Sequence, residues 1–525
     1  MPRTELPADP AGKFLHGVIL DACRRFASRT ALVDASCEPA RRMTYAELGE
    51  MIERLARGFV AAGIRPGEVV ALYLPNSWEF CAAYHAATLA GAIPTPLNPA
   101  YREREVRFQL ENSGAVLLIS DGRLLEGISL ASLPALRRVF TTRQSGAVGD
   151  EPLQSRLAAT NARLPEPSNP PEETLAALPF SSGTTGLPKG VMLTHANVVV
   201  NVFQSQPAGE EGFFGTEDVV LCFLPLYHIY GLNVIMNAAL AFGGTLVLLP
   251  RYDTARVLET SAREGVTCLP VVPPVLNAFC QAAEAGAFPR RHRLKWIMSG
   301  AAPLAPQLIN RFASLTGLPL RQGYGMTEAS PVTHLGFLDA ARYRPESIGH
   351  PVALTECRIV DTDGREVAPG ERGELVMRGP QFMRGYWNAP EATAAALRDG
   401  WYWSGDVACC DAGGFYFIVD RLKELIKYKG FAVAPAEVEA VLIQHPAVRD
   451  CGVVGKPDDC AGEIPCAFVV LRDSQQPSPA LTEELCAFVA ERLSSYKQPR
   501  EVRFVASLPR TPSGKILRRD LRSQL

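Results

Sequence analysis

The sequence contains no apolar stretch that reaches the ~20 residues a membrane-spanning helix needs. Its first residues, MPRTELPADPAGKF, lack the apolar core of a secretory signal peptide. None of the 13 cysteines forms a CxxC pair, and no His and Cys spacing suits zinc. Scattered cysteines of this kind are typical of a reducing compartment. We therefore expect a cytoplasmic protein without a membrane span.

A large excess of charge of either sign is also missing. The formal net charge is −2 over 525 residues, whereas nucleic-acid-binding proteins present a basic surface. Hydrophobic residues make up 47% of the chain and charged residues 21%, which is the balance of an ordinary globular enzyme. Composition thus argues against a nucleic-acid partner, and the length allows about two to four domains.

The order of the expected elements indicates an α/β protein. Strands and helices alternate over the first 250 residues, with a helix expected at 78–92, and this rhythm predicts parallel sheets covered by helices. Residues 355–420 change to short strands with Gly turns, which predicts a small β element. A compact α+β pattern follows. We expect a large N-terminal domain over residues 1–420 and a small C-terminal domain over residues 421–525.

One segment, FSSGTTGLPKGVMLTH, joins an unbroken run of small and hydroxylated residues to Lys189. Both a surface linker and a phosphate-binding loop have this composition. Apolar residues on both sides favour the loop, because a solvated linker would not lie between buried strands. Glycine lets backbone N–H groups approach an anion, hydroxyls donate hydrogen bonds and lysine adds charge. A Walker A loop is excluded, since Pro188 precedes the lysine and Gly190 follows it.

Four more segments carry residues that suit a nucleotide. RQGYGMTEASPV offers an aromatic ring for a purine and a carboxylate for Mg²⁺, although a strand-to-loop junction has the same pattern. YWSGDVA offers a carboxylate either for ribose hydroxyls or for a turn. A further segment, DRLKELIKYKGFAVAP, is rich in basic residues, although an ordinary solvated surface has the same composition. The last segment, PRTPSGKILRRDL, contains a lysine next to a Gly turn.

In this order, SSGTTGLPKG, GYGMTE, SGD, DRLKELIKYKG and PSGK resemble the AMP-forming adenylate superfamily of acyl-CoA synthetases, luciferases and nonribosomal-peptide adenylation domains. The resemblance covers nearly the whole chain, and PLYHIYGLN and SGAAPL are most similar to the branch of 4-coumarate–CoA ligases and luciferases. It implies that a carboxylic acid and ATP give an acyl-AMP and pyrophosphate, after which CoA gives acyl-CoA and AMP. The implied partners are the acid, ATP, Mg²⁺ and CoA, in a monomer or homodimer with a mobile C-terminal domain.

The resemblance also implies roles for single residues. Thr327 would meet the α-phosphate, Glu328 would hold Mg²⁺, and Lys515 would bridge the carboxylate and the α-phosphate. Lys423 would be the hinge of the small domain, and Lys427 would act after the domain turns. The residues implied to bind ATP or AMP are Ser181, Ser182, Gly183, Thr184, Thr185, Lys189, Ala301, Ala302, Gln322, Gly323, Tyr324, Asp406 and Arg421, and those implied to contact CoA are Arg251, Lys429, Gly430 and Phe431.

The implied acyl pocket is mostly apolar with a few polar groups. Such a pocket suits an aromatic propenoate such as 4-coumarate or a medium-chain fatty acid, and the sequence leaves both open. The 4-coumarate ligases have Gln after YKGF, where this chain has Ala432, so one hydrogen bond of that branch is missing. The residues implied to line the pocket are His228, Tyr230, Asn233, Val234, Met298, Ala301, Gly323, Pro331 and Val332.

Other functions remain to be weighed against this one. Amino-acid adenylation domains keep an Asp for the substrate ammonium, and PLYHIYGLN has none, which would leave a buried ammonium unpaired. Luciferase chemistry shares the adenylation step. A stand-alone acyl-AMP ligase would load a carrier-protein thiol, and a non-catalytic ligand-binding protein would be expected to lose Lys515 or Glu328, which are both present. His228 also has a purely structural alternative, namely a core histidine whose hydrogen bonds are satisfied within the fold.

Overall fold

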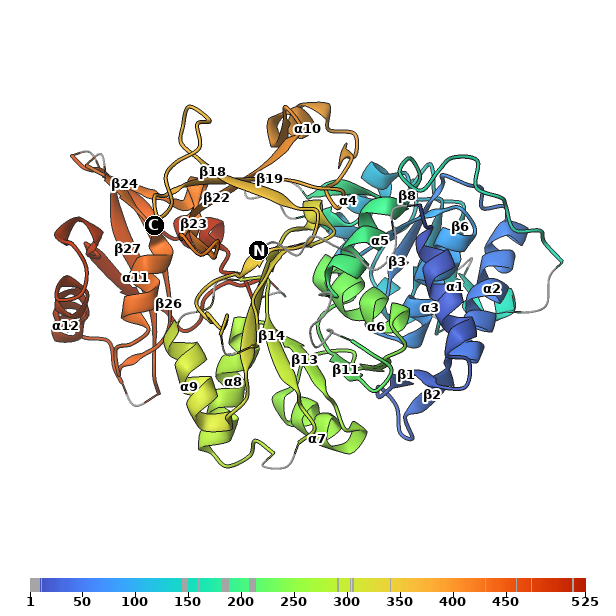
Figure 1. Cartoon of the computed structure of the whole chain (residues 1–525), viewed down its shortest axis with the longest axis horizontal. Coiled ribbons are helices and arrows are strands. Elements are labelled where there is room, and N and C mark those ends of the chain that lie inside the picture. Colours follow the sequence, from blue (N-terminus) through green and yellow to red (C-terminus); the bar gives the residue numbers. More distant parts are fainter. Residues whose placement is uncertain are drawn as a thin grey trace.

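A computed structural model describes residues 10, 12–143, 150–157, 161–181, 188–206, 214–289, 292–302, 304, 306–339, 341–429, 431–458, 460–473, 475–511 and 514–525. Figure 1 shows the first elements, in blue and teal, at one end of the molecule and the last elements, in orange and red, at the other. The predicted α/β class is confirmed. The predicted boundary at 420–421 stays a prediction. Among the described helices, none is long and apolar enough to cross a membrane.

The N-terminal end holds a parallel sheet that is buried on both faces. Along β3, Val70 and Leu72 join one apolar cluster and Val69 and Ala71 join another. Burial of both faces is typical of parallel sheets that helices cover on each side. The sheet has the order β4-β3-β5-β6-β7. The bounds are α1 Leu15–Arg25, α2 Tyr45–Ala61, β3 Val69–Tyr73, α3 Trp78–Leu89, β4 Ile93–Pro96, α4 Glu103–Ser113, β5 Leu117–Ser120, η1 Gly122–Leu125, β6 Arg138–Thr141, β7 Asp150–Pro152 and η2 Leu153–Leu157.

A second, mostly parallel sheet crosses the middle of the chain in the order β17-β16-β15-β14-β13-β11-β12-β1-β2. Ligands of open α/β sheets bind beyond the carboxyl ends of the parallel strands, and the motifs at 301 and 322–328 lie at or after such ends. The bounds are β1 Thr30–Asp34, β2 Arg41–Thr44, β11 Val219–Cys222, η3 Tyr230–Asn237, α6 Ala238–Ala241, β12 Thr245–Leu248, α7 Thr254–Glu264, β13 Cys268–Val271, α8 Pro273–Glu284, β14 Trp296–Ser299, α9 Pro306–Thr316, β15 Leu320–Gly325, η4 Thr327–Ala329, β16 Val332–Leu335 and β17 His350–Pro351.

Two smaller antiparallel arrangements complete the N-terminal part. In one, Lys189 of β10 pairs with Ser181 of β9, so the segment between them joins two paired strands as the bracketing apolar residues predict. In the other, Asp406 of β22 pairs with Arg421 of β23. The bounds are β8 Leu175–Ala177, β9 Phe180–Ser181, β10 Lys189–Thr194, α5 His195–Gln204, β18 Glu356–Val360, β19 Gly373–Arg378, β20 Gly385–Tyr386, α10 Pro390–Ala396, β21 Leu397–Arg398, β22 Trp401–Cys410 and β23 Tyr416–Arg421.

The residues after β23 build a sheet of order β25-β24-β27-β26, with β28 beside β27, and have apolar clusters of their own. Charged contacts tie this part to the rest. Glu437 of α11 accepts from Arg372, before β19, at 2.8 Å. The bounds are η5 Leu422–Glu424, β24 Ile426–Tyr428, β25 Phe431–Val433, α11 Pro435–Leu442, β26 Val448–Asp458, β27 Gly462–Leu471, α12 Pro479–Ala490, η6 Ser495–Lys497, β28 Glu501–Phe504 and α13 Arg518–Arg522.

Candidate active site

Lys515 comes from the C-terminal sheet region and meets residues of the N-terminal part. It lies in a hairpin that is closed by a bridge between Arg510 and Ile516. Its neighbour Gly514 has a φ of +85°, which suits glycine. A Cβ on Gly514 would lie 2.9 Å from Cγ of Pro274 in α8. Gly514 in this hairpin therefore lies directly against the N-terminal part.

Charged side chains surround Lys515. Its pKa is lowered to about 8, mainly by the loss of solvent around it and also by Arg421, while Asp406 and Glu328 act in the opposite direction. The lysine nevertheless keeps solvent-exposed surface. The site around Lys515 is therefore accessible, and a bound polyanion would compensate the positive charge of the partly desolvated ammonium.

Asp406 stands at the centre of a second group of contacts. Its carboxylate is buried, lies 2.6 Å from Nε of Arg421 and accepts a hydrogen bond from the Tyr324 hydroxyl. Pairing of β22 with β23 sets the Asp406–Arg421 contact, and β15 supplies Tyr324. The Asp406 carboxylate raises the pKa of Arg421. A buried carboxylate held beside an aromatic ring has the chemistry needed to hold a ribose next to a purine.

Glu328 receives hydroxyl donors from two other strands. Oγ of Ser181 lies 3.1 Å from Oε1 of Glu328, and the Tyr386 hydroxyl donates to the same oxygen at 2.8 Å. Nζ of Lys189 lies 5.3 Å from the centre of the Tyr386 ring. Ser181, at one end of the predicted phosphate-binding segment, therefore lies beside Glu328, and Lys189, at the other end, lies near the tyrosine that bonds Glu328. Thr327, at the start of η4, precedes this carboxylate and is half-buried.

A carboxylate such as Glu328 is the ligand type that Mg²⁺ uses in nucleotide sites, where phosphates and water complete the shell. Within the described residues, no group of three or more His, Cys, Asp or Glu gathers that could hold a metal by itself. Glu328 is 8% exposed, and its Oε1 already attracts two hydroxyl donors. It therefore fits a Mg²⁺ that arrives together with a nucleotide.

His228, Tyr230 and Ala301 are among the residues that line a small cavity, and His228 is near enough to Lys515 for the lysine charge to affect its pKa. Loss of solvent lowers the pKa of His228 to about 4, with a further contribution from Lys515. His228 is therefore neutral at pH 7. The Tyr230 hydroxyl donates to the carbonyl of Met298 at 3.2 Å, so the phenol ring is held against β14. This cavity is predominantly apolar and aromatic, unlike the charged side of Lys515.

The family model for AMP-binding enzymes matches residues 19–387, and the model for the AMP-binding enzyme C-terminal domain matches residues 437–515. The chain belongs to the AMP-binding enzyme family. It is 38% identical to 4-coumarate–CoA ligase 5 of Oryza sativa subsp. japonica, over 100% of this chain and 97% of that protein. It is also 38% identical to 4-coumarate–CoA ligase 1 of Narcissus pseudonarcissus, over 97% of this chain and 93% of that protein.

A solved structure supports the same relation. The crystal structure of the anthranilate CoA ligase AuaEII in complex with anthranoyl-AMP matches with a TM-score of 0.88 and 27% identity, over 98% of each chain. The superfamily and the 4-coumarate ligase branch that the motifs predict are thereby confirmed. The fold of an adenylate-forming enzyme, with a large N-terminal part and a smaller C-terminal part, is confirmed as well.

Several predicted nucleotide residues of this AMP-binding enzyme lie together at the ends of β14 and β15. Ala301 has a φ of +69°, an uncommon backbone conformation for a residue with a side chain. Ala302 follows and is half-buried. The Gln322 amide donates to the carbonyl of Pro345 at 2.6 Å, and Gly323 lies one residue before Tyr324. Their roles stay predictions.

The predicted acyl residues of the AMP-binding enzyme divide into two sets. Gly323 packs beside another predicted acyl residue, since a Cβ there would lie 3.6 Å from Sδ of Met298. Asn233 is instead engaged within the fold, because its amide donates to the carbonyls of Val198 at 3.2 Å and Ser330 at 2.5 Å. Three further residues are predicted to line the acyl pocket. Val234 in η3 and Val332 in β16 are buried, and Pro331 directly precedes β16.

A third set of predictions concerns the second step. Lys427 in β24, Lys429 just after β24, and Phe431 in β25 are exposed, and the Phe431 ring stacks on Tyr496 of the C-terminal part. Lys423 is exposed in η5, and Arg251 is exposed after β12. The structure therefore brings Lys515, Arg421, Asp406 and Glu328 into electrostatic contact, and the roles predicted for the second-step residues stay predictions.

Five predicted residues lie outside the part of the chain that the structure describes. They are Ser182, Gly183, Thr184 and Thr185, which follow Ser181, and Gly430, which follows Lys429.

Sequence reasoning missed Tyr386 and Tyr402. Tyr386 bonds Glu328, and the charge of Glu328 helps to raise the pKa of both phenols, after loss of solvent. The segment GYWN, which contains Tyr386, has the same glycine–aromatic order as GYG at 323–325. This order was the only sequence signal for Tyr386. The segment GYWN has no charged residue and no group of hydroxyl residues that would have marked it as a binding motif.

Proposed function

We propose that this AMP-binding enzyme is a carboxylic acid–CoA ligase that acts through an acyl-AMP. In the first step a carboxylate oxygen of the acid attacks the α-phosphorus of ATP, a P–O bond forms, and pyrophosphate leaves. In the second step the sulfur of CoA attacks the acyl carbonyl, the thiol proton is lost, and AMP leaves. The two steps replace oxide, a very poor leaving group, by AMP.

The convergence of Lys515, Arg421, Asp406 and Glu328 carries this proposal. An ammonium and a guanidinium in a site with reduced solvent can hold a carboxylate and a phosphate together and neutralise the charge that develops. Asp406 and Tyr324 would orient the nucleoside, and Mg²⁺ held by Glu328 would supply positive charge at the phosphates. Serine and lysine at the ends of the β9–β10 segment would meet the β- and γ-phosphates.

The second step requires a different arrangement of the same chain. Lys515 and Lys427 both lie in the C-terminal part, and the charges of Glu328 and Asp406 act on Lys515. One rigid unit cannot bring both lysines to the same reacting atom. The C-terminal part therefore turns about Lys423 after adenylation, and Lys427, Lys429 and Phe431 then face CoA, for which Arg251 supplies a further basic contact.

The acid is an aromatic propenoate of the 4-coumarate type. Two relatives are named 4-coumarate–CoA ligases, and the cavity beside Lys515 has the Tyr230 and His228 rings in its wall. Aromatic rings pack favourably against aromatic side chains in an offset or edge-to-face manner. A medium-chain fatty acid would fill the same apolar space without that preference.

The test is a pyrophosphate-release screen with purified protein, ATP and Mg²⁺ over cinnamate, 4-coumarate, benzoate and saturated acids, with and without CoA. We expect AMP and pyrophosphate as products, acyl-CoA by mass spectrometry, and the highest kcat/KM for a propenoate. Lys515→Ala serves as the control for site-dependent turnover. ADP and phosphate as products would refute the mechanism, and a preference for saturated acids would refute the aromatic assignment.

The same assay examines the alternative acceptor. Acyl-AMP that forms but is not consumed by CoA, and is consumed by a phosphopantetheine carrier protein, would identify a carrier-loading ligase. The cytoplasmic location, the monomeric or homodimeric state and the domain boundary at 420–421 stay predictions. Microscopy of a tagged protein, light scattering and limited proteolysis examine them in turn.

A further inference from the structure

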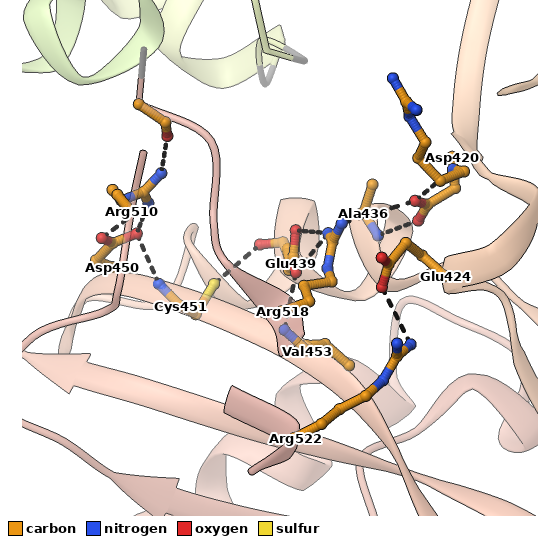
Figure 2. A network of polar contacts seen from close by, with 12 residues as sticks. Asp420, Glu424, Ala436, Glu439, Asp450, Cys451, Val453, Arg510, Arg518 and Arg522 are labelled. Carbon is orange, nitrogen blue, oxygen red and sulfur yellow. Dashed lines mark hydrogen bonds and ion pairs between the residues drawn. The ribbon is translucent and has the colours of Figure 1, made fainter. Parts of the chain in front are cut away.

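Arg510 links the hairpin of Lys515 to the C-terminal sheet (Figure 2). One nitrogen of its guanidinium, Nη1, donates to the backbone carbonyl of Gly514 at 2.6 Å. The other, Nη2, lies 2.8 and 2.9 Å from the two carboxylate oxygens of Asp450 in β26. A charged guanidinium held by a carboxylate makes stronger and more directional contacts than a neutral pair.

Asp450 is fixed in its turn. Its Oδ1 accepts the backbone N–H of Cys451 at 2.9 Å, and β26 pairs along its length with β27. The carboxylate therefore cannot follow the arginine if the hairpin moves. A series of contacts therefore runs from β26 through Asp450 and Arg510. It ends at the Gly514 carbonyl, in the peptide bond that joins Gly514 to Lys515.

The hairpin supplies contacts of its own, but these close it upon itself. The N–H of Thr511 donates to the carbonyl of Lys515 at 2.8 Å, and the N–H of Gly514 donates to the carbonyl of Thr511 at 2.8 Å. Such bonds fix the shape of the turn and leave its direction relative to the sheet to be set by other groups. On its outer side Gly514 meets Pro274 of α8.

We propose that Arg510, anchored by Asp450, is a positioning residue for the adenylation step, because it sets where the hairpin presents Lys515. This inference rests on the proposed function. Arg510 touches no reacting atom and acts through the Gly514 carbonyl. A displacement of about 1 Å in a catalytic contact can cost on the order of 10²-fold in rate. After the C-terminal part turns, Lys515 leaves the site, so the clamp has no effect on the second step.

Three single variants and one control test the proposal. Arg510→Ala removes the clamp, Asp450→Asn removes the charge that holds the guanidinium, and Arg510→Lys keeps a charge without the two-pronged geometry. Arg449→Ala is the matched control, because Arg449 also lies in β26 and pairs with a carboxylate, Asp473, at 3.0 Å. ATP–pyrophosphate exchange reports the first step, and acyl-CoA formation from synthetic acyl-AMP reports the second.

We expect Arg510→Ala to lower the kcat of exchange by about 10²-fold and Asp450→Asn by about tenfold, with thioester formation within twofold of wild type. Arg510→Lys should recover part of the loss, and Arg449→Ala should change neither step. The double variant Arg510→Ala/Lys515→Ala should be no slower in exchange than Lys515→Ala alone, since both changes act through one ammonium.

Equal loss of both half-reactions in Arg510→Ala, or additive losses in the double variant, would overturn the inference by assigning Arg510 to general folding. Unchanged exchange in Arg510→Ala would overturn it directly. These outcomes differ from a failure of the proposed function, in which the wild-type protein itself would show no exchange with any acid. Melting temperatures of all variants separate unfolding from misplacement.

Discussion

Among the single residues, we expect the first half-reaction to depend most on Lys515. We expect Lys515→Ala to reduce ATP–pyrophosphate exchange by about 10²–10³-fold, the usual cost of losing one preorganised electrostatic contact. Thioester formation from supplied acyl-AMP and CoA should be retained, because the lysine serves only one orientation. The two assays on one variant check this. A parallel loss in both would contradict the two-orientation mechanism.

The lowered pKa of Lys515 also sets a pH dependence. The charged form is the active one, so kcat/KM for ATP in the exchange reaction should be level below pH 8 and fall above it, because the pKa of this lysine is about 8 in the free enzyme. The fall approaches tenfold per pH unit. Lys515→Arg should move this limb to higher pH, since arginine stays protonated. If the fall in kcat/KM occurs at the same pH in Lys515→Arg, the titration belongs to another group.

Gly323 is predicted to lie between the nucleotide and the acid. A Cβ at this position would lie 3.3 Å from Leu335 and 3.6 Å from Sδ of Met298, which is itself a predicted acyl residue, so added carbons would fill space on that side. We expect Gly323→Val to shorten the accepted acids, with about 1–3 kcal/mol of discrimination per methylene-sized change. Relative kcat/KM values over acids of rising length measure this, with Gly323→Ala as the smaller step. An unchanged ranking would remove Gly323 from the pocket.

Among the elements, η5 carries the predicted hinge. Lys423→Pro fixes φ near −65° and should restrict rotation there. We expect pyrophosphate exchange to persist, because the structure already has Lys515 in place, while acyl-CoA formation from acyl-AMP falls at least tenfold. Lys423→Ala is the control that removes the side chain and keeps backbone freedom. Equal thioester rates in the Pro and Ala variants would move the hinge elsewhere.

The sequence predicts contiguous elements better than contacts between them. The β9–β10 segment and the Lys515 hairpin each lie within one motif, whereas the β22–β23 pair joins two neighbouring motifs. Tyr386 and Glu328 are 58 positions apart and Arg510 and Asp450 are 60 apart, and these pairs consist of common residue types. Only the fold shows that they meet.

η3 shows a second limit of sequence patterns. Its π-helical turns at Tyr230–Asn237 do not follow the usual helical period, and Gly231 permits an approach in which a Cβ would lie 2.2 Å from the carbonyl oxygen of Pro225. Such wide turns are frequent at functional sites. The wide turn brings Tyr230 to the cavity, and no periodicity argument anticipates it.

At the scale of the whole molecule, buried histidines limit stability in acid. His85 and His334 are fully buried, and loss of solvent lowers both pKa values to about 3, from 6.5. The unfolded chain therefore binds protons that the folded chain does not, and stability present above pH 6.5 is lost as the pH falls toward 3. Each histidine contributes up to about 1.4 kcal/mol per pH unit.

Denaturant unfolding at pH 7 and pH 5 checks this. We expect a lower midpoint at pH 5 for the wild type and a smaller pH difference for His85→Leu, whose ring nitrogens have no hydrogen-bond partner among the described residues. The packing cost of the substitution lowers stability at both pH values. It therefore cancels when the pH difference in each protein is compared. An identical pH difference in both proteins would exclude His85 as a contributor.

Docking of the Lys515 hairpin has a consequence for the sequence of events in a catalytic cycle. In water a lysine holds its proton up to a pKa of 10.5, and in the docked orientation the pKa is about 8. Docking and protonation thus oppose each other, so the Lys515 charge weighs against docking in the empty enzyme at neutral pH. In the proposed mechanism a bound triphosphate would supply the missing counter-charge and favour docking. Departure of pyrophosphate would remove most of that counter-charge, and the same lysine would then favour the turn that admits CoA.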